Sequence, residues 1–242
     1  MALSPWMEGE FIRITHESPT TRRFWVRIPS VERIDYQPGQ FFTFDLPIHE
    51  KKNKRWRSYS IASTPNDTNV LEFVIVQLEG GAGTRYLFED VQEGSSLILR
   101  GPLGNFLLPK DLSKEICFIC TGTGVAPFRS MLHYLHQQSE QPPAIHLIFG
   151  SRTMDNVLYR AELEQLAAEW DRFHYHPTLS REKSPEWTGR KGYVHNIYEE
   201  LYADRRDAYF YLCGWDVMLN EARERLGNMG YGKGQVIYES YG

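Results

Sequence analysis

The distribution of apolar residues changes near residue 110, and this change constrains the fold more than any other feature of the chain. Up to that point the sequence consists of short β-rich runs, which turn signals such as Gln37-Pro38-Gly39-Gln40 and Glu93-Gly94 separate. The runs lie at residues 24–28, 41–46, 71–78 and 96–99. Such spacing is typical of an antiparallel barrel.

Beyond Pro109, strand-like and helix-like segments alternate. We expect strands at residues 116–120, 145–149, 173–179, 209–213 and 236–238, and helices at 127–138, 156–170, 194–202 and 217–228. Alternation of this kind builds βαβ units with a parallel sheet, and ligands then bind at the carboxyl ends of the strands. The sequence therefore predicts an antiparallel β-barrel domain at residues 1–110, followed by an α/β doubly wound parallel-sheet domain at residues 111–242.

Composition argues against several classes of partner. The 27 Lys and Arg residues and the 31 Asp and Glu residues give a formal net charge of −4, which does not favour nucleic acid as a partner. The longest apolar run, residues 116–126, is far shorter than the roughly 20 residues that a helix needs to cross a bilayer. Because the first residues lack the basic and apolar regions of an export signal, we expect a cytoplasmic protein without membrane insertion.

Cysteine and histidine usage does not indicate a metal. Three cysteines are too few for a disulfide framework or for the four thiolates of an iron–sulfur cluster. Cys117 and Cys120 lie in the apolar run ICFIC, so we interpret them as buried strand residues rather than as a redox motif. His174 and His176 would share one face of a strand without other ligands at metal spacing, so we expect no metal site.

A glycine-containing turn follows the first strand of the second domain. It reads Thr121-Gly122-Thr123-Gly124-Val125-Ala126-Pro127 and precedes a helix pattern. Glycine lets the backbone approach a ligand closely, proline suits a first helical turn, and a helix N-terminus favours a pyrophosphate. The candidate nucleotide-binding residues are therefore Thr121, Gly122, Thr123, Gly124 and Pro127. The alternative is a structural turn that binds no ligand.

The first domain contains two further phosphate-binding signals. Arg57-Ser58-Tyr59-Ser60 combines a guanidinium, an aromatic ring and hydroxyls, and Gly80-Gly81-Ala82-Gly83-Thr84 precedes a short helix. On a strand, Arg57 and Tyr59 share one face and Ser60 takes the other, so one ligand meets all three only at a strand end or a twist. Each segment by itself could be a strand end or a loop. Together with the turn at residues 121–127, they predict two phosphate-binding sites on two domains.

These motifs, in this order, resemble those of the ferredoxin–NADP reductase family of flavoproteins. The resemblance covers nearly the whole chain, from Pro38-Gly39-Gln40-Phe41 to the C-terminal residues. It implies that the first domain binds FAD and the second binds NAD(P). It also implies that Arg57 binds the flavin pyrophosphate, Tyr59 stacks on the isoalloxazine and Ser60 forms a hydrogen bond near N5. The candidates for the second phosphate clamp are Gly81, Ala82, Gly83 and Thr84, and Ser58 is a further flavin-binding candidate.

Two more segments resemble the family at the nicotinamide site. Cys213-Gly214-Trp215-Asp216-Val217-Met218 matches its Cys-Gly-x-x-x-Met stretch, which implies that Cys213 lies beside the nicotinamide C4. From the residues alone, Asp216 is also expected to cap the next helix. The ending Glu239-Ser240-Tyr241-Gly242 resembles the family's Glu-x-aromatic tail with one extra residue. The resemblance implies that Tyr241 covers the flavin and yields to nicotinamide, and that Glu239 assists proton supply toward Ser60.

Nicotinamide specificity depends on the ends of the second and third parallel strands. These read Ser151-Arg152 and Ser180-Arg181, and Arg190 follows. A 2′-phosphate requires cationic donors, and the resemblance places serine and arginine here in relatives that use NADP. Pairing with nearby carboxylates would also explain surface arginines. We favour NADP(H) and keep NAD(H) open.

A cationic segment beside Arg57 bears on the electron partner. Residues 51–57 contain five cations and a tryptophan, and Arg22, Arg23 and Arg27 add positive charge. Acidic carriers such as ferredoxin, flavodoxin or another small redox protein would be steered toward such a surface. The segment could equally be a solvated hairpin loop that contacts the flavin adenosine.

We therefore expect a monomeric flavoprotein enzyme, similar to ferredoxin– or flavodoxin–NADP reductases, that exchanges a hydride between NADP(H) and FAD and single electrons with a carrier. One alternative is the reductase component of an oxygenase whose iron–sulfur protein is a separate chain. Another is a non-catalytic subunit that binds flavin and nucleotide in a larger complex. The reactive residue types at positions 60, 213, 239 and 241 argue against the last alternative.

Overall fold

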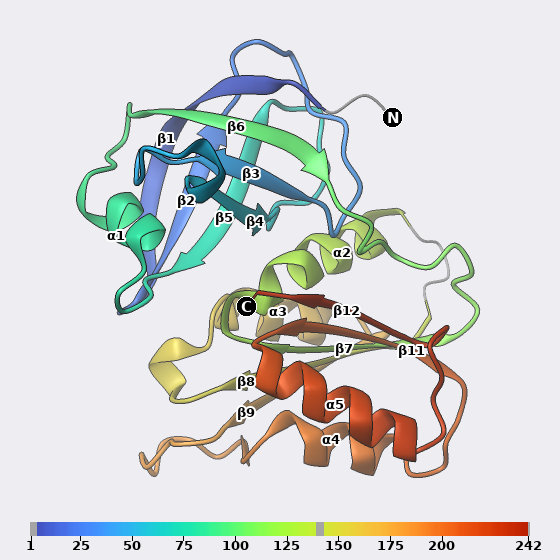
Figure 1. Ribbon diagram of the computed structural model, residues 1–242. Coiled ribbons are helices and arrows are strands. Elements are labelled where there is room, and N and C mark those ends of the chain that lie inside the picture. The colour runs from blue at the N-terminus through green and yellow to red at the C-terminus, as the bar shows by residue number, and fades with distance from the viewer. Residues whose placement is uncertain (1–3, 139–142, 242) are drawn as a thin grey trace. The chain divides into compact units, whose positions relative to one another are not determined.

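The computed structural model describes residues 4–138 and 143–241. Contacts divide the chain into two compact units, Met1–Leu108 with Ala126–Tyr134, and Pro109–Val125 with Leu135–Gly242. Figure 1 shows a first unit built mainly of strands and a second built of alternating strands and helices. The predicted boundary at residue 110 lies between β6 (Ser96–Leu103) and β7 (Glu115–Thr121). The first turns of α2 (Val125–Gln138) make their contacts in the first unit.

The first unit is a six-stranded antiparallel sheet in the order β4-β3-β6-β1-β2-β5. Just beyond β4, the amide of Ala62 donates a hydrogen bond of 2.8 Å to the carbonyl of Glu72 in β5, which joins the two outer strands. The predicted antiparallel barrel is confirmed. Its other strands are β1 (Trp6–Ser18), β2 (Thr21–Arg27), β3 (Phe41–Asp45), β4 (Trp56–Ser60) and β5 (Val70–Val76).

Aromatic residues fill the centre of this sheet. Phe11, Phe24, Phe42, Phe44 and Phe73 are fully buried in one cluster. The rings of Phe44 and Phe73 meet edge to face, with centroids 4.9 Å apart and an interplanar angle of 82°. Helix α1 (Ala82–Glu89) adds a buried leucine to the same cluster, so the glycine turn before it is anchored to the core.

Strand β1 begins at Trp6, in a segment where the sequence pattern predicts no strand before residue 24. Two irregularities obscure the alternation of inward-facing and outward-facing residues along this strand. The register shifts between Phe11 and Arg13, which breaks the period of two. The second irregularity is Gly9, which has no side chain at a position that faces apolar neighbours. A Cβ atom added there would lie 2.8 Å from Val26 Cγ1 and 2.9 Å from Leu99 Cδ2.

The second unit contains a parallel sheet in the order β10-β9-β8-β7-β11-β12. The predicted doubly wound parallel sheet is confirmed. Figure 1 shows α4 and α5 together on one side of this sheet, where their apolar residues form a single buried cluster with β7 and β11. The remaining elements are β8 (Ile145–Ser151), β9 (Phe173–Leu179), β10 (Arg190–Lys191), β11 (Ala208–Gly214), β12 (Val236–Ser240), α3 (Arg160–Glu169), α4 (Val194–Leu201) and α5 (Asp216–Asn228).

Two local predictions for this unit were wrong. The helix expected from residue 156 begins only at Arg160, because Met154–Asn156 form a 3-10 turn and Tyr159 adopts a left-handed conformation with φ 54°. Asp216 does not cap α5: Trp215 occupies the cap position and Asp216 is the first helical residue. The Asp216 carboxylate instead accepts a hydrogen bond from the Ser240 hydroxyl. None of the described helices is both long enough and apolar enough for a transmembrane span.

Candidate functional site

Arg57 and the glycine turn at residues 80–84 are distant in sequence but adjacent in the first unit. The guanidinium of Arg57 donates hydrogen bonds to the carbonyl oxygens of Lys54 (3.1 Å) and Trp56 (2.7 Å). A Cβ atom added at Gly83 would lie 3.1 Å from Cγ and 3.3 Å from Nε of Arg57. Since residue 83 has no side chain, the arginine lies directly against the first turn of α1.

The N-terminus of α1 has the features of an anion-binding turn. Gly81 is its cap residue, no side chain caps the helix, and the first turn contains no acidic residue. The first amides of a helix lack intrahelical acceptors, and the positive end of the helix dipole lies there. The Thr84 hydroxyl is already engaged, because it accepts a hydrogen bond from the Leu78 amide (3.0 Å) and donates one to the Gly81 carbonyl (3.2 Å). Thr84 therefore closes the turn, and the backbone amides are the groups available to a phosphate.

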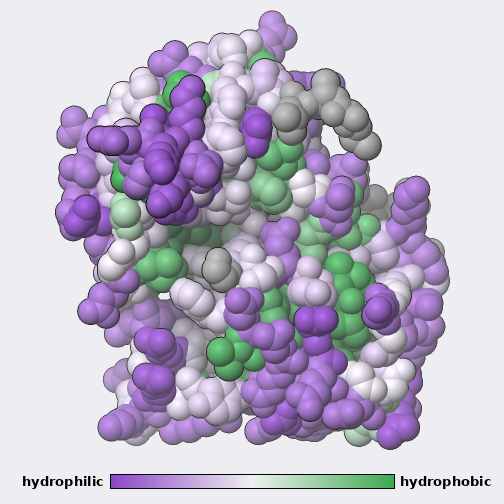
Figure 2. Space-filling model, in the orientation of Figure 1, coloured by the Kyte–Doolittle hydropathy of each residue, from purple (hydrophilic) through white to green (hydrophobic). Residues whose placement is uncertain are grey.

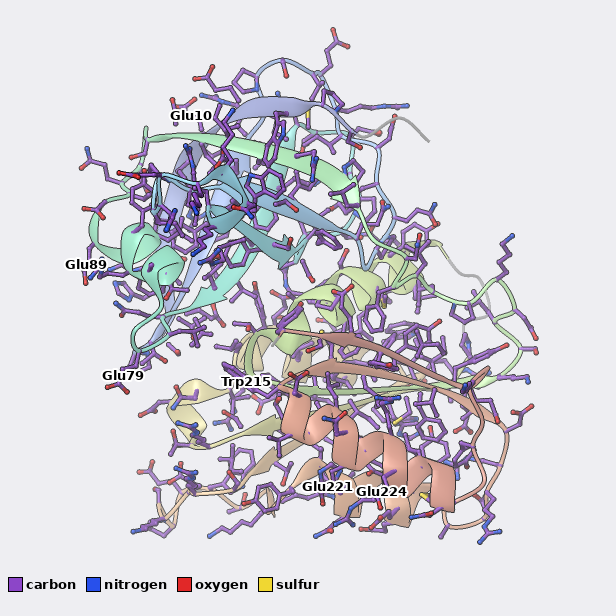
Figure 3. The ribbon with its side chains drawn as sticks, viewed as in Figure 1. Glu10, Glu79, Glu89, Trp215, Glu221 and Glu224 are labelled. Carbon is purple, nitrogen blue, oxygen red and sulfur yellow. The ribbon has the colours of Figure 1, made fainter. Side chains whose placement is uncertain are left out.

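An open pocket of about 450 Å³ lies beside the same turn. Its lining includes Gly80, Gly81 and Arg85, together with the carboxylates of Glu79 and Glu89. Figure 3 labels these two glutamates at the α1 side of the first unit. The two carboxylates would repel an anion. We therefore expect a phosphate to bind at the Arg57 side of the turn rather than in this pocket.

Side chains alternate along β4, as expected for a strand. Tyr59, on the face of Arg57, is half-buried and packs on Phe44 with ring centroids 5.0 Å apart. Burial raises the pKa of Tyr59 well above its ordinary value, so the ring stays neutral. Ser58 lies on the other face, with its hydroxyl 3.0 Å from that of Thr43. Ser60 is buried and is the last residue of the strand, where a ligand can meet both faces.

In the second unit, the turn after β7 packs tightly on the end of β11. A Cβ atom at Gly124 would lie 2.3 Å from the carbonyl oxygen of Cys213, so only glycine permits this approach. Gly214 has φ 146°, and a Cβ atom there would lie 2.5 Å from Thr121 Oγ1. The Thr121 hydroxyl is buried and has no hydrogen-bond partner within residues 4–138 and 143–241. Gly122 has φ 54° and open space around it. Thr123 lies between these glycines. Pro127 follows in the first turn of α2, which is grouped with the first unit, and is buried.

The two Ser-Arg pairs lie side by side at the carboxyl ends of β8 and β9. The Ser180 amide donates to the Ser151 carbonyl (3.0 Å), and the Arg181 amide donates to the Arg152 carbonyl (2.9 Å). Both arginine side chains are exposed. Neither guanidinium has a carboxylate or carbonyl partner in the described part of the chain. The structure therefore brings two uncompensated guanidinium groups to the edge of the sheet where ligands bind.

Arg190, the third predicted arginine, differs from these two. Its guanidinium forms a bidentate ion pair with Glu200, with N–O distances of 2.7 and 3.0 Å. The carboxylate of Glu182, the residue after Arg181, accepts hydrogen bonds from three backbone amides. Those amides lower the pKa of Glu182. Arg190 is thus neutralised within the protein.

Cys213 lies at the end of β11 and is fully buried. Burial raises the pKa of its thiol well above the ordinary value, so the sulfur is a neutral thiol. Strand β12 pairs with β11 so that Glu239 is in register with Cys213. The Tyr241 amide then donates to the Gly214 carbonyl (3.2 Å). Cys213, Glu239 and Tyr241 are therefore brought to one strand end, whereas Gly242 lies outside the described residues.

Trp215, which is not among the candidate residues predicted from the sequence, lies at the same strand end. Figure 3 labels its side chain at the carboxyl end of β11 and labels Glu221 and Glu224 along α5. Its side chain is 48% exposed. The sequence signal for this residue is a tryptophan directly after Cys213-Gly214 at a predicted strand end. An exposed indole at such a place offers a flat surface to a nucleotide.

His146 joins His174 and His176 in a row of histidines across β8 and β9. Its ring centroid lies 4.8 Å from that of His174 and 5.3 Å from that of His176. Nδ1 of His146 is 3.0 Å from Nε2 of His176. Burial lowers the pKa of both His146 and His176 to about 4. In the ranges that the structure describes, no group of three His, Cys, Asp or Glu residues could hold a metal ion.

The residues present fit two nucleotide cofactors. Arg57 against the uncapped α1 suits the pyrophosphate of a flavin dinucleotide, and Tyr59 supplies a neutral ring on the same face. The Thr121 hydroxyl, which has no hydrogen-bond partner among the described residues, and the close backbone approach that Gly124 permits suit a second dinucleotide. Each unit thus contains its own glycine turn with the features of an anion-binding site.

Comparisons with known proteins agree with this division. The family model "Oxidoreductase FAD-binding domain" matches residues 8–107, and "Oxidoreductase NAD-binding domain" matches residues 118–224. The ferredoxin–NADP reductase B of Sorangium cellulosum is 36% identical over 231 residues, which cover 90% of this chain and 92% of that protein. The anthranilate 1,2-dioxygenase electron transfer component of Acinetobacter baylyi is 31% identical over 211 residues, 87% of this chain. This chain spans only 60% of that relative's length.

Among solved structures, the Amycolatopsis cytochrome P450 reductase GcoB matches with a TM-score of 0.87 and 23% identity. The match covers 100% of this chain and 72% of that one, and it shows a shared fold. The two domain models and the extent of the match to the Sorangium protein together lead to one assignment. The chain belongs to the ferredoxin–NADP reductase family of flavoprotein oxidoreductases.

Proposed function

We propose that this protein is an FAD-dependent NADP(H) oxidoreductase that exchanges single electrons with a small carrier protein such as a ferredoxin or a flavodoxin. FAD, when bound, exchanges a hydride with the nicotinamide and single electrons with the carrier. The observation that carries the proposal is a glycine turn at a helix N-terminus in each unit, with Arg57 at the first and, beside the second, arginines that are unpaired among the described residues. We assign FAD to residues 1–110 and NADP(H) to residues 111–242.

On the flavin side, we assign the pyrophosphate to the Arg57 guanidinium and to the first amides of α1, at Ala82 and Gly83. Thr84 keeps that turn closed through its hydroxyl. The neutral ring of Tyr59 supplies a stacking surface. Ser60, at the strand end, supplies a hydroxyl that can donate near N5. Ser58 is bonded to the neighbouring strand, so its contribution is limited to its backbone.

On the nicotinamide side, we assign the pyrophosphate to the backbone of Gly122, Thr123 and Gly124 and to the unpartnered hydroxyl of Thr121. Pro127 preforms the first turn of α2 behind them. The neutral thiol of Cys213 positions the nicotinamide without adding charge. We assign to Glu239 the role of holding a proton for the Ser60 hydroxyl, and to Tyr241 the role of excluding water from the reacting face when FAD is bound.

The preference for NADP(H) rests on Arg152 and Arg181. A 2′-phosphate would supply an anionic partner for both exposed guanidinium groups, which have none in the part of the chain that the structure describes. The Ser180 amide donates to the Ser151 carbonyl (3.0 Å) and joins the two strand ends, and the Ser151 hydroxyl donates to the Asn156 carbonyl (2.9 Å) and fixes the turn after β8. Arg190 takes part only if its pair with Glu200 opens.

A second candidate function is the reductase of an oxygenase that has a separate iron–sulfur protein. The similarity to an anthranilate 1,2-dioxygenase electron transfer component supports it. All three cysteines of this chain are free and buried, so a cluster would be carried by another protein. Free thiols also fit a reducing compartment, and we propose a cytoplasmic monomer.

Reduction of the bound flavin by NADPH and by NADH in separate anaerobic stopped-flow runs tests the proposal. We expect NADPH to reduce the flavin at least ten times faster, which corresponds to about 1.4 kcal/mol of transition-state preference. Faster reduction by NADH would contradict the assignment of Arg152 and Arg181. No reduction by either nucleotide would support the non-catalytic alternative.

A further inference from the structure

A buried carboxylate interrupts the apolar run of β5. The strand reads VLEFVIV, and Glu72 is only 4% exposed. Figure 2 shows many hydrophilic side chains at the visible surface of the first unit, where charged groups are ordinarily found. Burial of a charged group costs free energy unless the group is paired and hydrogen-bonded. The partners of Glu72 therefore indicate why a carboxylate lies at this position.

Two arginines pair with the two oxygens of this carboxylate. Nε of Arg23, in β2, lies 2.7 Å from Oε1 of Glu72. Nη1 of Arg129, in α2, lies 3.1 Å from Oε2 of Glu72. Residues Ala126–Tyr134 of α2 are grouped with the first unit, so both ion pairs lie within that unit. The Arg129 side chain is 12% exposed and that of Arg23 is 24% exposed, so the pair with Arg129 is the less solvated of the two.

Arg129 also contacts the backbone just beyond β4. The same nitrogen, Nη1, donates a hydrogen bond of 2.8 Å to the carbonyl oxygen of Ala62. Ala62 is fully buried, and its amide donates to the carbonyl of Glu72 (2.8 Å). Since bulk water does not reach this carbonyl, removal of its donor would leave a buried acceptor without compensation. Arg129 and β5 therefore hold both backbone groups of Ala62.

The next residue, Ser63, is fixed as well. Its hydroxyl accepts a hydrogen bond from the Glu72 amide (3.1 Å), and its carbonyl accepts one from the Tyr36 hydroxyl (2.8 Å). Residues 62 and 63 follow Ser60, the last residue of β4, by two and three positions. The chain that continues from Ser60 is therefore held by side chains and backbone groups from β5 and α2 and by Tyr36.

Resting on the function proposed above, we propose that Arg129 is a positioning residue for flavin reduction, which acts through the Ala62 carbonyl to hold the Ser60 hydroxyl in place. Displacement of a reacting group by about 1 Å can lower a rate about 100-fold. A buried ion pair contributes little net stability compared with apolar residues of similar volume. The conformation that Arg129 and Glu72 select for residues 60–63 therefore explains this pair better than stability does.

The test compares three variants of the FAD-loaded enzyme with the wild type. Arg129→Gln removes the positive charge and the donor to the Ala62 carbonyl. Arg129→Lys retains one charged nitrogen, and a single nitrogen makes both contacts in the wild type. Arg23→Gln is the matched control, because it removes the other cation that pairs with Glu72 and leaves Arg129 in place.

Two measurements are made on each protein. Anaerobic stopped-flow reduction by NADPH, without a carrier protein, gives the limiting rate of flavin reduction and the Kd for NADPH. Hydrogen exchange, followed by mass spectrometry of the peptide that contains residues 60–63, reports whether this segment is held. The exchange measurement requires neither nucleotide nor turnover, so its result does not depend on activity.

We expect Arg129→Gln to lower the limiting rate at least tenfold and to leave the Kd for NADPH within threefold. Residues 60–63 should exchange at least tenfold faster in this variant, because the Ala62 carbonyl has lost its donor. Arg129→Lys should restore both values to within threefold of the wild type. Arg23→Gln should stay within threefold in both measurements, although the urea midpoint should fall in both glutamine variants.

A wild-type limiting rate or unchanged exchange in Arg129→Gln would overturn the positioning role. An equal loss of rate in Arg23→Gln would overturn it too, because the effect would then come from the Glu72 carboxylate in general. Failure of NADPH to reduce the wild-type flavin would instead contradict the proposed function, and the exchange measurement would still decide whether Arg129 holds residues 60–63. If Arg129→Gln does not fold, the double variant Arg129→Met with Glu72→Leu, which replaces the pair by apolar residues, is used with the same expectations.

Discussion

Arg152, Arg181 and Arg190 are equivalent candidates in the sequence, but the structure predicts unequal effects of replacing them. Arg152 and Arg181 are exposed and unpaired in the described part of the chain, whereas Arg190 already forms two hydrogen bonds with Glu200. An anion that approached Arg190 would have to displace that carboxylate. We therefore expect Arg152→Gln and Arg181→Gln to weaken NADPH use, and Arg190→Gln to have little effect.

The magnitude follows from the exposure of the two free guanidinium groups. Two unit charges 4 Å apart attract by about 1 kcal/mol in water and by about 4 kcal/mol near a protein surface. Hydrogen bonds to a charged group contribute about 1.5–3 kcal/mol. For exposed side chains we take the lower end, about 1.5 kcal/mol, which is roughly a tenfold change in kcat/KM.

Steady-state kinetics with ferricyanide as the acceptor measure this change in kcat/KM directly. Each of Arg152→Gln and Arg181→Gln should lower kcat/KM for NADPH about tenfold and leave NADH unchanged, because NADH lacks the 2′-phosphate. Arg190→Gln should stay within about threefold. The double variant should lose less than the product of the single effects, since the two arginines are neighbours. A loss at Arg190 as large as at Arg152, or a parallel loss of NADH activity, would refute the reasoning.

Three further predictions concern the flavin turn, the nucleotide turn and the histidine row. Arg57→Gln should raise the Kd for FAD by at least about tenfold in a fluorescence titration, because a charged phosphate contact is lost, whereas Ser58→Ala should leave it nearly unchanged. Gly124→Ala should lower the free energy of unfolding in urea by about 1–3 kcal/mol, since its Cβ would lie 2.3 Å from the Cys213 carbonyl oxygen; an unchanged midpoint would contradict the tight approach. The folded-state pKa of His146, about 4, lies below its ordinary 6.5, so the unfolded chain takes up a proton first as the pH falls through that window. The wild type should therefore lose about 2 kcal/mol more stability than His146→Gln between pH 6.5 and 5, and parallel losses would argue against a buried neutral ring.

The sequence by itself determined the order of the elements and the two glycine turns. Strand and helix periods are local properties, because the side-chain repeat of each element follows from its backbone geometry. Glycine turns such as the one around Gly124 are local as well, since a missing Cβ permits conformations that other residues avoid. For this reason the barrel, the doubly wound sheet and the positions of both turns could be predicted. Strand β1 was not predicted, because the bulge after Phe11 interrupts its alternation.

Only the tertiary structure decided which of the chemically similar side chains are available to bind a ligand. Arg190 is neutralised by Glu200 of α4, and nothing in the segment around Arg190 encodes that pair. Arg129 is engaged by Glu72 and by the Ala62 carbonyl, whose residues lie 57 and 67 positions away in the sequence. Such pairings depend on distances through space between separate elements, which a local pattern does not contain. The sequence therefore identifies the kinds of group that a site needs, and packing between distant segments selects those that remain free to bind.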